Sequence, residues 1–143
     1  MQIELLPEAI VQDFKKWTEK KSAQVDKAVR NRTKEALDDV VSASPVRKRV
    51  PKSGVIRTDG EIKDNYQPGA YKKGWMKYVS TARAGRTQGY VRNKTNFQLV
   101  HLLELGHKAR DGSQVNAIEH VNPAEERARE GLDRDIDRIL GED

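Results

Sequence analysis

The chain has no cysteine, and this absence excludes two kinds of stabilising chemistry. None of its 143 residues is a cysteine, so neither a disulfide bond nor a thiolate metal site can form. No apolar run approaches the roughly 18 residues that a membrane span needs. The first ten residues, MQIELLPEAI, are acidic and lack a basic region ahead of an apolar one. We therefore expect no secretory signal, no membrane contact and a soluble intracellular protein.

Apolar side chains are also scarce. Hydrophobic residues make up 36% of the chain, aromatic residues 6% and charged residues 34%. A chain of this length without a long linker is most simply one domain, residues 1–143, with a small core. Such chains are often elongated, or become stable only as oligomers.

The net charge of +5 is unevenly distributed. Residues 1–43 hold 8 basic and 8 acidic side chains, residues 44–94 hold 13 and 3, and residues 95–143 hold 6 and 11. The basic middle segment has three interpretations. The first is a surface that binds a polyanion. The second is one of two oppositely charged patches that pack head to tail in an oligomer. The third is a solvated basic loop.

Apolar residues at helical spacing predict one long helix over residues 8–43. No proline or glycine interrupts the pattern, and its positions recur at steps of three, four and seven: Val11, Phe14, Thr18, Val25, Val29, Ala36 and Val40. The stripe weakens around residues 20–22, where we expect a bend or an exposed turn. Prolines and glycines then predict an irregular basic loop over residues 44–74, with a short hairpin around the Asp-Gly at 59–60.

The second half of the chain predicts a small sheet and two further helices. Residues 75–80 and 88–93 form a strand hairpin within 75–94. Residues 96–105 are apolar on nearly every side and predict a short buried helix, with Asn96 as its cap and Gly106 at its end. Residues 115–118 suggest another short strand. Asn122, followed by a proline, predicts the start of a terminal helix over 122–140. The predicted fold class is α+β.

All three histidines lie close together in the sequence. His101, Glu104 and His107 form H-x-x-E-x-x-H, whereas the zinc-protease pattern places its histidines at i and i+4. Six residues turn a helix through about 600°, so the two rings diverge by about 120°. His101 and Glu104 share a face and could ligate a metal with outside help. The simpler interpretation pairs His101 with Glu104 and places His107 at the helix C-terminus.

Catalysis has little other support. Asp111 and Ser113 lie near His107 in a polar stretch where such residues form turns, and a triad is defined by geometry. We predict that the protein is not an enzyme and binds no cofactor or metal.

Aromatic residues are interleaved with the basic segment. Tyr66, Tyr71, Trp75, Tyr78 and Tyr90 alternate with lysines and arginines, as in single-strand binders that stack bases in a basic groove. The same aromatics fall mainly on predicted strands, where they more often form core. Signatures of RNA-binding motifs, zinc fingers and helix-turn-helix domains are missing. A non-specific nucleic-acid-binding protein that uses residues 44–94 is therefore our alternative function.

Five motifs occur in a fixed order along the chain. They are SPV (44–46), PGAYKKGW (68–75), GYVRN (89–93), LVHLLELGH (99–107) and HVNPAEE (120–126). Together they resemble the head–tail joining, or tail-completion, proteins of long-tailed bacteriophages and prophages, over about residues 9–140. One departure is the basic, turn-rich insertion at 47–67, since such chains often pass from SPV to YKKGW in a short turn.

The resemblance implies a non-catalytic structural protein of the virion neck, assembled in the host cytoplasm. It would form a ring, expected to be a hexamer, between the portal-side connector or stopper protein and the tail-tube or tail-terminator protein. Genomic DNA would pass through the ring and touch it transiently and without specificity. The candidate contacts with the DNA or with these partners are Arg47, Lys48, Arg49, Lys52, Arg57, Lys63, Lys72, Lys73, Arg83 and Arg86.

Overall fold

A 36-residue helix, α1 (Glu8–Ala43), forms the axis of the molecule. The computed structural model describes residues 8–46, 68–82 and 86–142. The other elements are α2 (Ala70–Lys73), β1 (Trp75–Ala82), β2 (Arg86–Asn93), α3 (Phe97–Leu105), β3 (His107–Lys108), β4 (Gln114–Val115) and α4 (Val121–Gly141). The predicted α+β class, long first helix and strand hairpin are confirmed. The predicted hairpin around 59–60 and Tyr66 lie outside the described residues.

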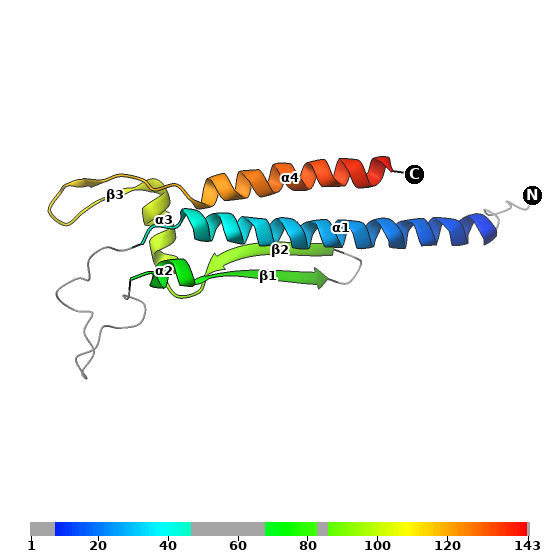
Figure 1. The fold of residues 1–143 in the computed structure, drawn as a ribbon, viewed down its shortest axis with the longest axis horizontal. Helices are drawn as coiled ribbons and strands as arrows, with labels where there is room; N and C mark the ends of the chain where they lie inside the picture. The colour runs from blue at the N-terminus through cyan, green and yellow to red at the C-terminus, as the bar shows by residue number, and fades with distance from the viewer. Residues whose placement is uncertain (1–7, 47–67, 83–85, 143) are drawn as a thin grey trace, which may run out of the picture.

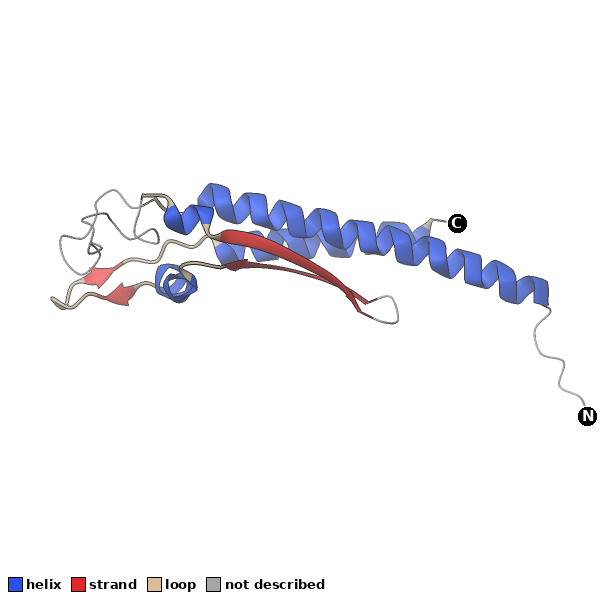
Figure 2. Ribbon diagram, turned by 90° about the horizontal axis from the view of Figure 1, so that it is seen from below, coloured by secondary structure: helices blue, strands red, loops and turns tan. Residues whose placement is uncertain are grey.

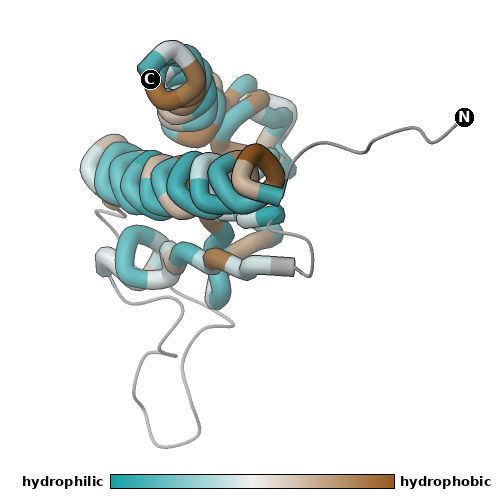
Figure 3. The backbone as a smooth tube through the Cα atoms, turned by 90° about the vertical axis from the view of Figure 1, so that its right-hand side faces the viewer, coloured by the Kyte–Doolittle hydropathy of each residue, from teal (hydrophilic) through white to brown (hydrophobic). Residues whose placement is uncertain are grey.

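Helix α1 is covered on two sides. Helix α4 packs along one side and the β1–β2 hairpin lies along the other, so that α4, α1 and the hairpin are stacked in three layers (Figures 1 and 3). The helices run antiparallel, because Asp39 near the end of α1 binds Arg127 near the start of α4. Helix α3 and the small β3–β4 sheet lie together at one end of the molecule (Figure 2).

The hairpin presents alternate residues to α1, as strand geometry requires. Trp75 pairs with Asn93, Val79 with Gly89, and Thr81 with Thr87 on the inner face. Gly89 permits close packing, because a Cβ there would overlap the hydroxyl of Thr33 and lie 2.9 Å from its Cβ. The backbone of β2 at Gly89 therefore lies directly against the Thr33 side chain of α1.

The core is small and lies where α1, the hairpin and α4 converge. Its buried cluster contains Val40, Tyr71, Trp75 and Ala124, with partly buried aliphatic side chains around it. This agrees with the low apolar content of the sequence. Most of α1 and α4 faces solvent, as their predominantly hydrophilic colouring indicates (Figure 3).

Salt bridges and a lysine cap hold α1 to α4. Arg32 on α1 makes a two-pronged contact with Asp135 on α4, at 2.8 and 3.1 Å. The Lys21 ammonium donates to the main-chain oxygens of Ile139 and Glu142 at the end of α4, where a cation is favoured by the exposed carbonyls. Lys21 is buried and α1 continues through it as helix. At the bend or exposed turn predicted for residues 20–22, the helix is uninterrupted, and Lys20 and Ser22 are exposed, whereas Lys21 is not.

Three other predicted boundaries differ from the structure. Ala70–Lys73 forms one helical turn within the segment that we predicted to be irregular. The strand predicted at 115–118 pairs only at Gln114–Val115, although the Ile118 amide still bonds the Leu103 carbonyl at 2.7 Å. Helix α4 begins at Val121 with His120 as its cap residue, rather than with Asn122.

The predicted burial of the 96–105 helix is only partly correct, because Leu99, Val100 and Leu103 pack against the core cluster while other residues of the helix are exposed. The helix itself forms, but Phe97 is 62% exposed and Leu105 is 76% exposed. The only buried residue of α3 is the charged Glu104. We expected the apolar side chains of this helix to be buried in the core. The core is small, however, and covers only part of the helix.

Candidate functional site

The buried carboxylate of Glu104 caps helix α4 from a different helix. Its Oε1 accepts hydrogen bonds from the backbone amides of His120 (2.7 Å) and Val121 (2.8 Å), and its Oε2 accepts one from Asn122 (3.2 Å). These amides belong to the first turn of α4, which has no partner for them within the helix. A negative charge is also favoured at a helix N-terminus. Glu104 therefore fixes the junction between α3 and α4.

His120 is buried at the centre of the same junction, with 1% exposure. Its Nδ1 lies 2.7 Å from both the Ile118 carbonyl and Glu104 Oε1. Both neighbours are acceptors, so Nδ1 carries a proton. In the neutral ring, Nε2 then accepts from the Tyr71 hydroxyl at 2.6 Å. The ring also meets Tyr71 and Trp75 edge to face, so a polar network and an aromatic cluster share one site.

Asn93 connects this cluster to the hairpin. Its Nδ2 donates to the Tyr71 carbonyl at 2.7 Å, and its Oδ1 accepts from the amides of Thr95 (3.2 Å) and Asn96 (2.8 Å). One buried side chain thus ties α2, the end of β2 and the start of α3 together. The predicted cap at Asn96 makes no capping hydrogen bond with its own side chain.

The pKa shifts follow from these contacts. Burial alone would raise the pKa of Glu104, but three backbone amides and the nearby His120 outweigh it, so the pKa is lowered. Burial, with a smaller contribution from the negative charge of Glu104, raises the pKa of Tyr71. Both shifts favour the forms that make the network, an ionised carboxylate and a neutral phenol, so the site is a packing junction rather than an acid–base pair poised for catalysis.

The structure separates the histidines that the sequence places together. His101 is exposed, and Glu104 engages His120 instead, so the predicted His101–Glu104 pair is wrong. His107 begins β3, and its buried Nδ1 has no hydrogen-bond partner among the described residues. Within residues 8–46, 68–82 and 86–142, no group of three or more His, Asp or Glu side chains is arranged to hold a metal. Over the same residues, no helix is long and apolar enough to cross a bilayer.

The predicted basic contacts are only partly described. Lys72 and Lys73 lie on α2, beside the core end of the hairpin, and Arg86 begins β2 at the opposite end. Because a strand rises about 3.3 Å per residue, the eight residues of β2 separate these positions by about 25 Å. They form no single cluster. Arg47, Lys48, Arg49, Lys52, Arg57, Lys63 and Arg83 lie outside the described residues.

The interleaved aromatics divide between two roles. Tyr71 and Trp75 are buried in the core, as the simpler interpretation predicted. Tyr78 and Tyr90 face away from α1, stack at 5.4 Å between ring centroids, and carry Arg92 over the Tyr78 ring at 4.4 Å. This outer face of the hairpin combines an exposed ring, Tyr90, and a half-buried ring, Tyr78, with a cation.

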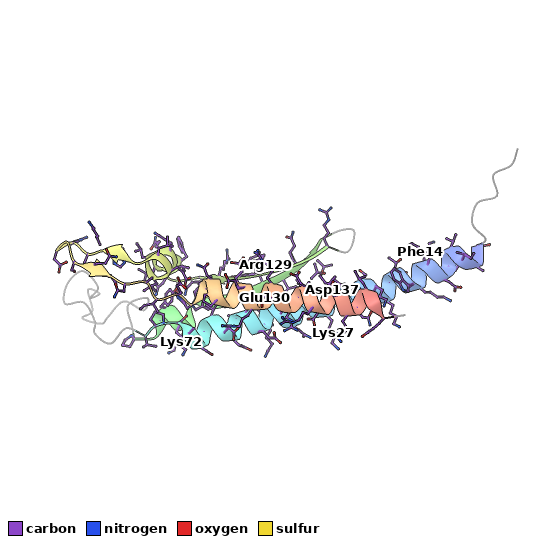
Figure 4. The ribbon with its side chains drawn as sticks, turned by 90° about the horizontal axis from the view of Figure 1, so that it is seen from above. Phe14, Lys27, Lys72, Arg129, Glu130 and Asp137 are labelled. Carbon is purple, nitrogen blue, oxygen red and sulfur yellow. The ribbon has the colours of Figure 1, made fainter. Side chains whose placement is uncertain are left out.

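Large apolar side chains are exposed at both ends of the molecule. At one end, α1 extends beyond the end of α4, and every residue from 8 to 20 is exposed (Figures 1 and 4). Phe14 is 65% exposed there and stacks on Trp17. At the other end lie Phe97 and Leu105 of α3, with exposed Ile118 in the segment that leads to α4. Because large exposed apolar patches are typical of surfaces that contact other molecules, both ends are candidate contact surfaces.

Sequence reasoning missed both the Glu104 cap and the exposed helix end. A glutamate in an otherwise apolar helix was the available signal for the first, because a buried carboxylate must find donors. The second had a signal as well, since the predicted first helix is much longer than the last. A comparison of the chain with protein-family models, with curated proteins and with solved structures found no match.

Proposed function

We propose that this chain is a structural subunit of a bacteriophage neck, which joins the DNA-filled head connector to the tail as a ring through which DNA passes. The observation that carries the proposal is the pair of exposed apolar ends on an elongated subunit, Phe14 and Trp17 at one end and Phe97 and Leu105 at the other. A ring needs unlike faces that meet heterologously. The head-side and tail-side partners of the ring would each need additional exposed apolar surface to bind to.

The remaining features suit a structural role. The small core is what an assembly-dependent subunit tolerates, because association adds stability to the folded chain. The buried polar network around His120 holds elements together. In this proposal the ring contains several copies, expected to be six. Its partners are a connector or stopper protein and a tail-tube or tail-terminator protein, and the ring resides in the virion after assembly in the host cytoplasm.

Deletion of the gene from the phage that encodes it tests the joining role. We expect DNA-filled heads and complete tails that remain separate in electron micrographs, and rescue when the wild-type chain is supplied in trans. Joined, infectious particles without the protein would refute the proposal.

The basic residues allow a second test, of whether they line the channel (the lumen) of the proposed ring. We propose that Lys72, Lys73 and the 47–67 segment face the passing DNA, whose duplex carries about one charge per 1.7 Å. A chain without residues 47–67, or one with Lys72→Glu and Lys73→Glu, should still join heads to tails but deliver DNA more slowly. Lys27→Glu with Lys34→Glu, on α1, is the charge-matched control. Normal delivery by both altered virions would remove these residues from the lumen.

The outer face of the hairpin favours one alternative, a nucleic-acid-binding protein. Tyr78, Tyr90 and Arg92 there could stack on bases and attract phosphates. This alternative expects the isolated chain to bind single-stranded DNA, with an affinity that falls steeply with salt and with Tyr90→Ala. The neck proposal expects only weak binding that Tyr90→Ala leaves unchanged, so a fluorescence titration at two salt concentrations separates the two.

A further inference from the structure

One edge of strand β1 has no hydrogen-bond partner. The amide of Lys94 donates to the carbonyl of Gly74 at 2.8 Å, and these two residues lie one step before the Trp75–Asn93 pair of the hairpin. Opposed residues in an antiparallel pair alternate between hydrogen-bonded and non-hydrogen-bonded pairs. The even-numbered residues of β1 therefore bond to β2, and the backbone N–H and C=O groups of the odd-numbered residues point to the other side. These outward-facing residues are Trp75, Lys77, Val79 and Thr81.

This edge is open on the outside of the molecule. The sheet contains only β1 and β2, and none of the outward backbone groups of β1 has a hydrogen-bond partner among the residues that the structure describes. In Figure 1, β1 lies along the side of the molecule away from α4. The outer edge of β2 is different, because Thr87, Gly89 and Val91 there line a pocket that they share with α4. The open edge of the hairpin is therefore that of β1.

The edge has little of the protection that free strands usually carry, such as bulges, prolines and several charges. Each of the eight residues of β1 opposes one residue of β2, so the strand has no bulge. Its sequence, WMKYVSTA, has no proline and a single charge, Lys77. A free edge of this kind is a template for another strand, because an extended backbone supplies the matching N–H and C=O groups. The chemistry of the edge therefore specifies a β-strand as the partner.

Strand β1 of a second copy matches the edge. Two copies of one strand run antiparallel about a two-fold axis. In the register that places Tyr78 opposite Tyr78 of the second copy, Trp75 lies opposite Thr81 and Lys77 lies opposite Val79. Every outward-facing residue then meets another outward-facing residue, and each such pair exchanges two hydrogen bonds. No charge lies directly opposite a like charge.

The outer face of the hairpin favours the same register. Tyr78 and Tyr90 already stack there within one copy. With Tyr78 opposite Tyr78, the two stacks would join into one row of four rings, and cross-strand aromatic pairs stabilise sheets.

The helices that cover the inner face leave room for this pairing. Neighbouring strands lie about 4.8 Å apart, so the centres of two joined hairpins would be about 10 Å apart. Each hairpin packs on its own α1, and packed helices are separated by about 8–10 Å. The two α1 helices therefore fit side by side on one face of the joined sheet.

We propose that two copies of the chain pair through β1, edge to edge and antiparallel, and form one continuous four-stranded sheet. A two-fold contact joins the same surface of both copies and closes on two chains. The proposed ring uses other surfaces, the apolar ends of the subunit. The inference therefore goes beyond the proposed function and does not rest on it.

A proline at an outward-facing position tests the pairing. Lys77→Pro removes one outward N–H from each copy but no bond between β1 and β2, and proline is tolerated at such positions of an edge strand. Sedimentation velocity of the full chain should show a dimer whose dissociation constant rises by at least about tenfold in this variant, because two hydrogen bonds of the dimer are lost.

The matched control is Lys77→Thr, which removes the same charge but keeps the N–H. This control should dimerise at least as well as the wild-type chain. Circular dichroism and thermal unfolding of both variants establish that the fold is retained.

Cysteine crosslinking tests the register without the proline variant, since the chain has no cysteine of its own. Tyr78→Cys should form a disulfide-linked homodimer under mild oxidation, because side chains in a non-hydrogen-bonded pair lie closest together. Tyr90→Cys is the matched control. It changes the same residue type on the same face, but its counterpart lies three strand spacings away, at about 14 Å, so no disulfide should form.

A mixed crosslink defines the register further. In the proposed register Met76 lies opposite Ser80 of the second copy. A mixture of Met76→Cys and Ser80→Cys chains should form a disulfide-linked heterodimer, and neither variant alone should crosslink.

Three results would overturn the proposal. The first is a wild-type chain that remains monomeric at about 1 mM, the limit of weak association. The second is unchanged dimerisation of a folded Lys77→Pro variant. The third is a disulfide that forms as readily in Tyr90→Cys as in Tyr78→Cys.

Discussion

A single buried carboxylate organises the junction of α2, α3 and α4. Glu104 accepts three backbone amides of α4 and lies 2.7 Å from Nδ1 of His120. A buried charge is tolerated only when its hydrogen bonds are complete. This explains why an apolar helix with exposed Phe97 and Leu105 still has a fixed position. Its one buried side chain anchors it to α4.

Glu104→Gln should lower the free energy of unfolding by about 2 kcal/mol at pH 7, because the charge that favours three amides is lost. The pKa of Glu104 is lowered in the folded state, so its contribution is present above its unfolded pKa of about 4.3 and is lost as pH falls through the folded pKa. The difference between variant and wild type, measured by urea unfolding, should shrink below about pH 4. Glu119→Gln, at an exposed carboxylate nearby, should change stability little at any pH.

Gly89 controls how closely the hairpin approaches α1, since a Cβ at this position meets Thr33. Gly89→Ala should destabilise the fold by about 1–3 kcal/mol through overpacking. Thr33→Ala in the same chain should recover part of that loss, because it removes the overlapping hydroxyl. Gly141→Ala, where a Cβ meets nothing within 4 Å, is the matched control. Equal stability of Gly89→Ala and the control, by thermal unfolding, would contradict the close approach.

At the scale of elements, ion pairs contribute to the packing of α1 against α4. Arg32 and Asp135 are partly buried, with 26% and 15% side-chain exposure, and the contact is two-pronged. The hydrogen bonds that Arg32 donates to Asp135 and Glu35 raise the pKa of Arg32, and those that it donates to Asp135 lower the pKa of Asp135. Lys34 and Asp38, by contrast, form a pair on one turn of α1 with both side chains exposed.

Double-mutant cycles should separate the two pairs. Arg32→Gln with Asp135→Asn should give a coupling energy of about 1 kcal/mol, because the geometry is two-pronged and less solvated. Lys34→Gln with Asp38→Asn should give about 0.3 kcal/mol, which is typical of an exposed pair. Urea denaturation of the four chains in each cycle measures this. Equal couplings would mean that Arg32 and Asp135 do not hold the helices together.

At the scale of the whole molecule, the apolar residues that stabilise the fold are buried, whereas those available for association with other molecules are exposed. Val40 is buried in the core cluster, whereas Phe97 and Leu105 lie on the outside of α3. Helix α1 is about 54 Å long, and its C-terminal end is in the core while residues 8–20 at its N-terminal end are exposed. Stability and association should therefore respond to different residues.

Phe97→Gln with Leu105→Gln should change the free energy of unfolding of the isolated chain by less than about 1 kcal/mol, since both positions are largely exposed. Val40→Ala should cost about 2 kcal/mol. Under the proposed function, the double variant should nevertheless fail to restore head–tail joining in the deletion phage. A fully active double variant would show that this end of α3 contacts no partner.

The sequence by itself determined the order and type of the main elements. Uninterrupted helical spacing after Glu8, β-branched and aromatic residues around Trp75, and the glycine at Gly106 each act over a few neighbouring residues. Local sterics and hydrogen bonding are enough to decide them. Gly106 adopts a positive φ of 70°, and β4 lies close against it, because a Cβ there would be 2.6 Å from the Val115 carbonyl oxygen.

Only the tertiary structure decided which side chains meet. Glu104 contacts His120 and the start of α4 rather than His101, which is three residues away. A buried carboxylate needs hydrogen-bond donors, and the backbone amides at the start of α4 have no partners within the helix. Leu99, Val100 and Leu103 of the 96–105 helix pack against the core cluster, whereas Phe97 and Leu105 point away from it and stay exposed. The position at which α4 packs on α1, with its last carbonyls at Lys21, leaves residues 8–20 exposed. Each of these depends on which surfaces are already covered by distant segments, and the pattern of neighbouring residues does not contain that information.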